Sequence, residues 1–349
     1  MIVMPRHLGF SIGALLSLSL AFPSFAEEEP LTVKKDAPTT YTVVKGDTLW
    51  DISAMYLDSP WLWPRLWQVN PEIDNPHLIY PGDRLSLIWR NGHPVLSLKP
   101  MMKLSPKVRV LEKEALSTVN EGLVLPYIES DRLLSESDIA VSPRVLGSSD
   151  GKTFLSNQGL LYITGEHKVK SWTIYRPLKK YTRDDHQMVV LKQIATAELA
   201  ETKSEFSGLS VVTQTQEILV DDIALPEVDM DLSALSTTFY PAPSPQESVA
   251  NILGSIEGSQ FVGQNQVVVI DRGAVDQLRQ GSMFELYKQG VSVDIEGAES
   301  DETYLPDTRI GHLMVIRPYA HFSLALVTES SEPVSQKTLL KSPLVNMAQ

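Results

Sequence analysis

The chain has 349 residues, a formal net charge of −13 at pH 7, 23 prolines and no cysteine. This length indicates two or three domains, each able to bury a hydrophobic core. The lack of cysteine excludes disulfides, a thiol nucleophile, a thiolate zinc site and an iron–sulfur cluster, and the acidic balance disfavours nucleic-acid binding, which relies on clustered lysine and arginine.

Residues 1–26 have the pattern of a secretory signal peptide. Arg6 supplies a positive start, residues 8–20 are apolar or small, and small residues stand three and one positions before Glu27. The apolar run is shorter than the ~20 residues of a membrane span, although an uncleaved anchor is the alternative. We therefore expect the mature chain to start near Glu27, to have no membrane span and to lie in the periplasm, associated with the cell wall.

Residues 27–40 are charged and lack periodicity, which predicts a flexible leader. The block at residues 41–90 is dense in aromatic residues, since it holds five of the six tryptophans: Trp50, Trp61, Trp63, Trp67 and Trp89. Such a density indicates a small, tightly packed unit. We expect the first four of these side chains in a core or on a partner surface rather than beneath a sugar.

The same block predicts the order strand, helix, helix, strand. Residues 41–44 are β-prone, and Thr48 is a candidate helix N-cap with an aspartate three residues later. A second helix follows with Pro64 in its first turn, because an interior proline would clash with the preceding turn. A turn at residues 80–83 then leads into a second strand at residues 84–89.

Several separated motifs in this block agree with one known pattern. In chain order they are Tyr41-x-Val43, Gly46-Asp47-Thr48-Leu49, Ile52, Asn70-Pro71 and Ile79-Tyr80-Pro81-Gly82-Asp83-x-Leu85. With these motifs the block resembles a LysM domain, and the resemblance covers about a seventh of the chain. It implies a βααβ fold that binds N-acetylglucosamine-containing polymers, chiefly peptidoglycan or chitin. The arrangement as a whole looks like uncharacterised exported LysM-containing proteins of Gram-negative bacteria.

The resemblance also implies a shallow glycan groove between the first strand–helix loop and the second helix–strand loop. The residues expected to contact glycan there are Gly46, Asp47, Thr48, Asn75, Leu78 and Ile79. Loop amides suit the one donor and one acceptor of an N-acetyl group, and a shallow site with few polar contacts implies weak binding per domain. The open alternatives are that Gly46, Asp47 and Thr48 serve only the turn and the helix cap, and that Leu78 and Ile79 belong to the core.

The rest of the chain divides by composition. Residues 91–137 hold four prolines and predict a connector with one short helix near residues 119–134. Two β-rich modules are expected at residues 138–228 and 249–349, separated by a Pro-rich linker at residues 229–248.

The two β-rich modules look alike. In the stretches at residues 159–226 and 265–343, an alternating strand precedes a strand that ends in tyrosine and basic residues. A variable loop, β-prone segments and a short final strand follow in both stretches. This is a weak but ordered internal repeat, and its spacing favours small all-β barrels or sandwiches.

The sequence has no motif for the cysteine-dependent or zinc-dependent hydrolases that cleave the cell wall. The chain has no cysteine nucleophile, and the seven histidines form neither His-x-His nor His-Glu-x-x-His. The cluster Asp184-Asp185-His186 is expected in a loop, as are most acidic residues. We therefore expect no enzyme, no cofactor and no metal site.

The sequence thus predicts an α+β multidomain protein, in which a βααβ LysM module is followed by β-rich repeat modules. We expect a non-catalytic, peptidoglycan-binding periplasmic protein whose β modules contact a protein partner in the envelope. One alternative is a cell-wall hydrolase or an activator of one. The other is a structural interaction protein whose LysM block has lost glycan binding.

Overall fold

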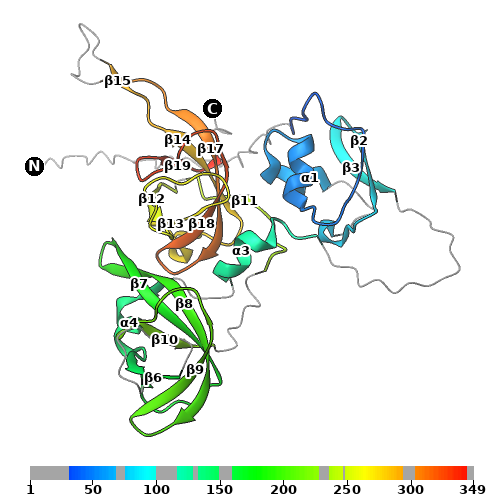
Figure 1. Cartoon of the computed structure of the whole chain (residues 1–349). Helices are drawn as coiled ribbons and strands as arrows, with labels where there is room; N and C mark the ends of the chain where they lie inside the picture. The colour runs from blue at the N-terminus through cyan, green and yellow to red at the C-terminus, as the bar shows by residue number, and fades with distance from the viewer. Residues whose placement is uncertain are drawn as a thin grey trace, which may run out of the picture.

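The computed structural model describes residues 31–67, 75–99, 116–128, 133–148, 159–227, 236–246, 248–293 and 303–343. These form a small N-terminal unit and two β-barrels, with a short helix between them (Figure 1). The expected signal peptide lies outside these residues. Within the described residues, no helix has the length and apolar character needed to cross a membrane.

The N-terminal unit has the expected order of strand, two helices and strand. Its elements are β1 (Thr40–Thr42), α1 (Leu49–Tyr56), η1 (Pro60–Leu62), α2 (Trp63–Trp67), η2 (Pro76–Leu78), β2 (Arg84–Arg90) and β3 (His93–Lys99). The three strands form one antiparallel sheet in which Tyr41 lies opposite Leu85. The helices pack on a core that includes Leu49, Ile52 and the fully buried Trp63.

Local sequence explains these elements. The side chain of Thr48 caps α1 by accepting a hydrogen bond from the amide of Asp51, as expected of a capping residue. Pro64 is the second residue of α2, where its missing N–H costs no helix bond. Asn91 and Gly92 both have positive φ, which gives the tight turn that joins β2 to β3.

Two segments are more ordered than expected. The residues from 31 onwards do not form a free leader, because the backbone N–H of Lys34 donates to the Tyr56 carbonyl at 2.8 Å and its ammonium donates to the Ala54 carbonyl at 2.7 Å. Strand β3 lies within the expected connector, where alternating residues after a hairpin turn pair with the full length of β2. The sheet of the N-terminal unit therefore continues to Lys99.

The first barrel, barrel 1, contains β5 (Val145–Ser148), β6 (Leu160–Thr164), β7 (Ser171–Arg183), β8 (His186–Thr202), β9 (Phe206–Gln214) and β10 (Ile223–Pro226). The strands pair in the order β10-β7-β8-β9-β6-β5. A bridge between Arg144 and Ile223, with the Val145 amide bonded to the Asp222 carbonyl at 2.9 Å, closes the sheet. Strand β4 (Leu133–Ser135) pairs with the start of β8 and leads into α4 (Glu136–Val141).

The second barrel, barrel 2, contains β12 (Ala250–Ser255), β13 (Val267–Ile270), β14 (Ser282–Lys288), β17 (Thr308–Pro318), β18 (Ser323–Ser330) and β19 (Leu339–Lys341). They pair in the order β14-β17-β18-β13-β12-β19, and β19 returns to β14 to close the ring. The turn η4 (Ala274–Asp276) precedes β14, and β11 (Ala242–Pro243) joins β14 in parallel. A two-stranded extension, β15 (Ser292–Val293) with β16 (Thr303–Tyr304), lies between β14 and β17.

The two barrels have the same topology. If β5 to β10 are matched with β12, β13, β14, β17, β18 and β19, the ring order around both barrels is identical. Each barrel has its own apolar interior, with Trp172 and Ile174 in barrel 1 and Phe284 and Val315 in barrel 2. The expected repeat of β-rich modules is therefore confirmed, and the modules are barrels rather than sandwiches.

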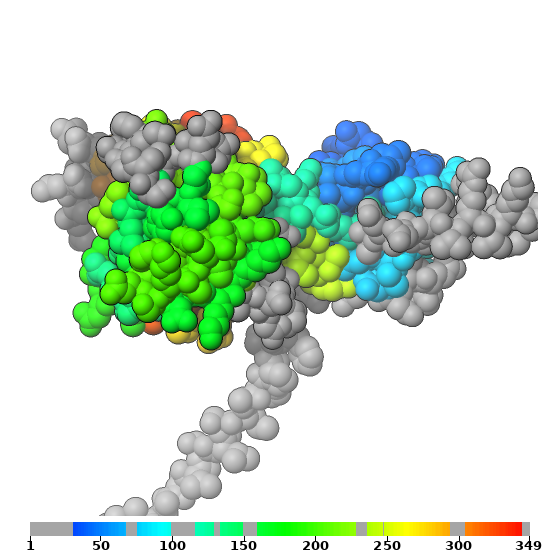
Figure 2. Space-filling model, turned by 60° about the horizontal axis from the view of Figure 1, so that its bottom comes forward, coloured from blue at the N-terminus to red at the C-terminus, as the bar shows by residue number. Residues whose placement is uncertain are grey.

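A further apolar cluster, the junction core, joins the N-terminal unit, α3 and both barrels. Helix α3 (Glu121–Ile128) lies at its centre, in the region where a short helix was expected. The cluster includes Trp61 of the N-terminal unit, Val124 of α3, Tyr181 of barrel 1 and Phe322 of barrel 2. Figure 2 shows the teal residues around α3 between green barrel 1 and the blue N-terminal unit.

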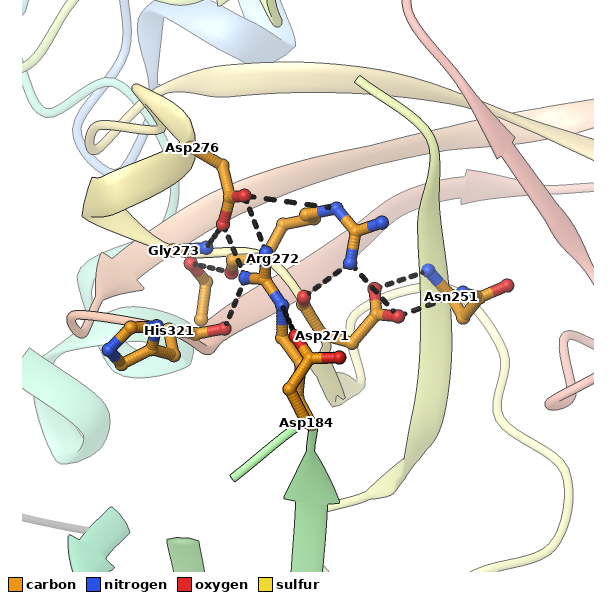
Figure 3. A network of polar contacts seen from close by, with 9 residues as sticks. Asp184, Asn251, Asp271, Arg272, Gly273, Asp276 and His321 are labelled. Carbon is orange, nitrogen blue, oxygen red and sulfur yellow. Dashed lines mark hydrogen bonds and ion pairs between the residues drawn. The ribbon is translucent and has the colours of Figure 1, made fainter. Parts of the chain in front are cut away.

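The barrels also meet through charged groups. The β7–β8 hairpin of barrel 1 ends at Arg183, whose guanidinium contacts Asp276 of η4 and the carbonyl of His321 between β17 and β18. Figure 3 shows Asp276 at this joint together with Arg272, Asp271 and Asn251 of barrel 2. Burial alone would raise the pKa of Asp276, but hydrogen bonds from Arg183 and the Gly273 amide outweigh it and lower that pKa.

Candidate functional site

The β1–α1 loop forms one side of the expected groove. Gly46 has a φ of +98°, which favours glycine at this turn. The carboxylate of Asp47 accepts hydrogen bonds from the Val44 amide at 2.8 Å and from the Tyr41 hydroxyl at 2.9 Å. Burial, reinforced by this bond to Asp47, raises the pKa of Tyr41. The Asp47 side chain is thus engaged within its own turn.

Thr48 is almost wholly buried at the start of α1. Its hydroxyl accepts from the Asp51 amide at 3.1 Å and donates to the Asp51 carboxylate at 2.7 Å. This arrangement satisfies the third amide of the helix. The amides of the first two helical residues, Leu49 and Trp50, find no partner inside the helix and need acceptors from elsewhere.

The loop before β2 forms the other side. Asn75 is exposed and caps η2 by accepting a hydrogen bond from the His77 amide at 3.0 Å. Leu78 is 51% exposed, whereas the neighbouring Ile79 is fully buried in the core of the N-terminal unit. An apolar wall at the groove surface is therefore available from Leu78.

The six expected residues thus lie on the two expected loops but differ in accessibility. Gly46, Asn75 and Leu78 are exposed, Asp47 is half-buried, and Thr48 and Ile79 are buried. Their role in glycan contact stays a prediction.

A segment outside this block lies between the two loops. This segment, residues 116–118, accepts hydrogen bonds from the first two amides of α1. The Leu49 amide donates to the Ser117 carbonyl at 3.1 Å, and the Trp50 amide donates to the Thr118 carbonyl at 3.0 Å. On the other side, the Leu116 amide donates to the His77 carbonyl at 3.0 Å. The sequence did not reveal this segment, because its hydrogen-bond partners lie about 40 to 70 positions earlier in the chain and no local motif marks such a distant contact.

His77 holds the same segment through its ring. The Nδ1 atom lies 2.8 Å from the Leu116 carbonyl, so the ring donates from Nδ1 in its neutral form. Burial lowers the pKa of His77, and the bond to the Leu116 carbonyl opposes this only in part. His77 is therefore neutral near pH 7.

An aromatic side chain from the linker completes this edge. Tyr240 packs against Trp63 and His77, with ring centroids 5.1 and 5.3 Å away. Its hydroxyl reaches the Asn75 side-chain oxygen at 3.4 Å, and half of its surface stays exposed. Tyr240 and Leu78 thus present exposed apolar surface beside the groove.

The cluster Asp184-Asp185-His186 was expected in a loop. The two aspartates lie in the turn between β7 and β8 at the barrel joint, and His186 is the first residue of β8. His186 stacks on His321 with centroids 3.4 Å apart. Burial, with the neighbouring His186 and Arg183, lowers the pKa of His321. In the described part of the chain, no group of three or more histidine, aspartate or glutamate side chains could hold a metal ion.

Comparison with known proteins agrees with the N-terminal unit. The LysM domain family matches residues 41–87. A relative, the uncharacterized protein YqbP of Bacillus subtilis, is 40% identical over 63 residues, which cover 15% of this chain and 29% of the relative. The chain thus spans less than a third of this relative's length. Residues 41–87 are a LysM domain, a module of cell-wall-associated proteins that binds peptidoglycan and related N-acetylglucosamine glycans.

Proposed function

We propose that this chain is a non-catalytic, periplasmic peptidoglycan-binding protein. The LysM domain would hold it at N-acetylglucosamine-containing glycan, and the two barrels would contact a protein partner in the envelope. The observation that carries the proposal is the LysM match at residues 41–87, together with two loops that leave Leu78 and Asn75 exposed beside an aromatic Tyr240.

The glycan proposal is tested by sedimentation of the mature chain with purified peptidoglycan sacculi. Leu78→Asp is expected to reduce the bound fraction, because a charge replaces the apolar wall for the N-acetyl methyl group. Leu146→Asp is the matched control, since Leu146 is 49% exposed on barrel 1 and far from this loop in sequence. Equal binding by wild type and Leu78→Asp would contradict a site at this groove.

The non-catalytic role is tested by zymography on the same sacculi. We expect no clearing by the full chain alone. Clearing by the chain alone would show a hydrolase. More clearing by an added hydrolase in the presence of the chain than in its absence would show an activator.

A further inference from the structure

The groove between the β1–α1 and η2–β2 loops is filled by the chain itself. Segment 116–118 accepts hydrogen bonds from the first two amides of α1 and, on the opposite side, donates one to the carbonyl of His77. All three of its residues are buried, and Thr118 has no exposed surface. The segment therefore fills the space between the two loops rather than lying over it.

The chemistry of this contact resembles that of an N-acetyl group. A peptide unit and an acetamido group each present one carbonyl acceptor and one N–H donor. The two carbonyls of the segment accept from the first two amides of α1, and its Leu116 amide donates to the His77 carbonyl. A glycan N-acetyl group entering between these loops would need the same backbone groups.

The segment is fixed at both ends. The Leu116 side chain packs into the core of the LysM domain. The Thr118 hydroxyl donates to the Phe239 carbonyl at 2.5 Å and accepts from the Phe239 amide at 2.9 Å, while the Thr118 amide donates to the Thr237 carbonyl at 2.8 Å. Since Phe239 belongs to the junction core, the groove contact is tied to the packing of the LysM domain on barrel 2.

We propose that segment 116–118 is an internal ligand of the LysM groove, which glycan must displace in order to bind. This inference rests on the proposed glycan-binding function. The full chain then binds N-acetylglucosamine oligomers more weakly than a chain whose segment is released. Loosening of the contact between residues 116–118 and 237–239 opens the groove.

The test compares the mature full-length wild type with the double variant Leu116→Ala, Thr118→Val. This variant removes the apolar anchor and both hydroxyl bonds to Phe239 while keeping the β-branched shape at position 118. Thr213→Val is the matched control, because the Thr213 hydroxyl pairs with Thr196 on barrel 1, at 2.6 Å. Affinity for a short N-acetylglucosamine oligomer is measured by calorimetry, and exchange of the Leu49 and Trp50 amides is measured by NMR.

We expect the double variant to bind the oligomer at least about tenfold more tightly than wild type, a change of about 1.4 kcal/mol. Its Leu49 and Trp50 amides should exchange faster without oligomer and become protected when oligomer is added. Thr213→Val should match wild type in both measurements. A far-ultraviolet spectrum equal to that of wild type shows that the double variant is folded.

Two results would overturn the inference in different ways. Equal affinity of wild type and double variant, with faster exchange in the variant, would show that glycan binds without displacing the segment. Absence of binding by every chain, again with faster exchange in the variant, would show that the glycan-binding proposal itself is wrong and that the segment is only a structural joint.

Discussion

The guanidinium of Arg183 in barrel 1 holds the carboxylate of Asp276 in barrel 2 through two hydrogen bonds of 2.5 and 2.7 Å. Both side chains are about four-fifths buried, and the same guanidinium reaches the His321 carbonyl at 3.0 Å. A bidentate guanidinium–carboxylate contact fixes the relative orientation of the two side chains as well as their distance. The pair therefore sets how the β7–β8 hairpin sits on barrel 2.

Arg183→Ala should loosen the joint between the barrels. Hydrogen bonds to charged groups contribute about 1.5–3 kcal/mol each, and Asp276 would lose both bonds from Arg183 while keeping its contacts with Gly273 and Arg272. We expect a loss of about 2 kcal/mol in the free energy of urea unfolding and faster amide exchange in the hairpin. Lys170→Ala, which removes an exposed pair with Glu198 at 3.5 Å, should change little, and an equal effect of both variants would contradict this role.

The pH dependence of stability should include a contribution from His77. Its pKa is lowered in the folded chain, so the unfolded chain takes up a proton first as the pH falls through about 6.5. Stability is therefore complete above about pH 6.5 and declines toward the lower pKa of the folded state, by at most about 1.4 kcal/mol per pH unit.

The measurement for His77 is urea unfolding at pH 7.5 and 5.5. His77→Gln cannot take up the proton but keeps a side-chain donor for the Leu116 carbonyl. Wild type should lose more stability between the two pH values than His77→Gln. The same loss in both chains would assign the pH dependence to other groups.

Leu78 and Ile79 are neighbours with opposite environments, which allows a direct comparison. Ile79→Ala should lower stability by about 2–5 kcal/mol, because it leaves a cavity in the LysM core. Leu78→Ala should leave the thermal midpoint of unfolding nearly unchanged, since half of that side chain is already exposed. Calorimetric unfolding of both variants checks this, and a large loss for Leu78→Ala would place that side chain in the core.

Trp61 should couple the LysM domain to the barrels. Its side chain is 5% exposed and packs into the junction core rather than into the core of its own domain. Trp61→Ala should cost about 3–5 kcal/mol and raise amide exchange in α3 and along segment 116–118. Trp89→Ala is the matched control, because Trp89 is largely exposed on β2, and it should change neither. Unchanged exchange in α3 after Trp61→Ala would contradict the coupling.

Much of the LysM domain follows from local rules in its sequence. Thr48 caps α1 and Pro64 lies in the first turn of α2 as predicted, because caps and prolines act over a few residues. The repeat of the barrels was also visible, since alternating strands in the same order build the same ring. Segment 116–118, Tyr240 and the Arg183–Asp276 pair were not predictable, because each meets partners far away in sequence and no short motif encodes such a meeting.

The shared topology of the barrels has a consequence for their symmetry. The hairpin β7–β8 of barrel 1 docks on loops of barrel 2, while the described part of the corresponding hairpin of barrel 2, β14–β17, extends away from barrel 1 (Figure 1). The two copies thus meet head to tail, not about a two-fold axis. In a head-to-tail pair, one of the two equivalent hairpins is not used in the contact between the barrels. Here it is the β14–β17 hairpin of barrel 2, which carries three apolar side chains with about half or more of their surface exposed: Val291, Tyr304 and Leu305.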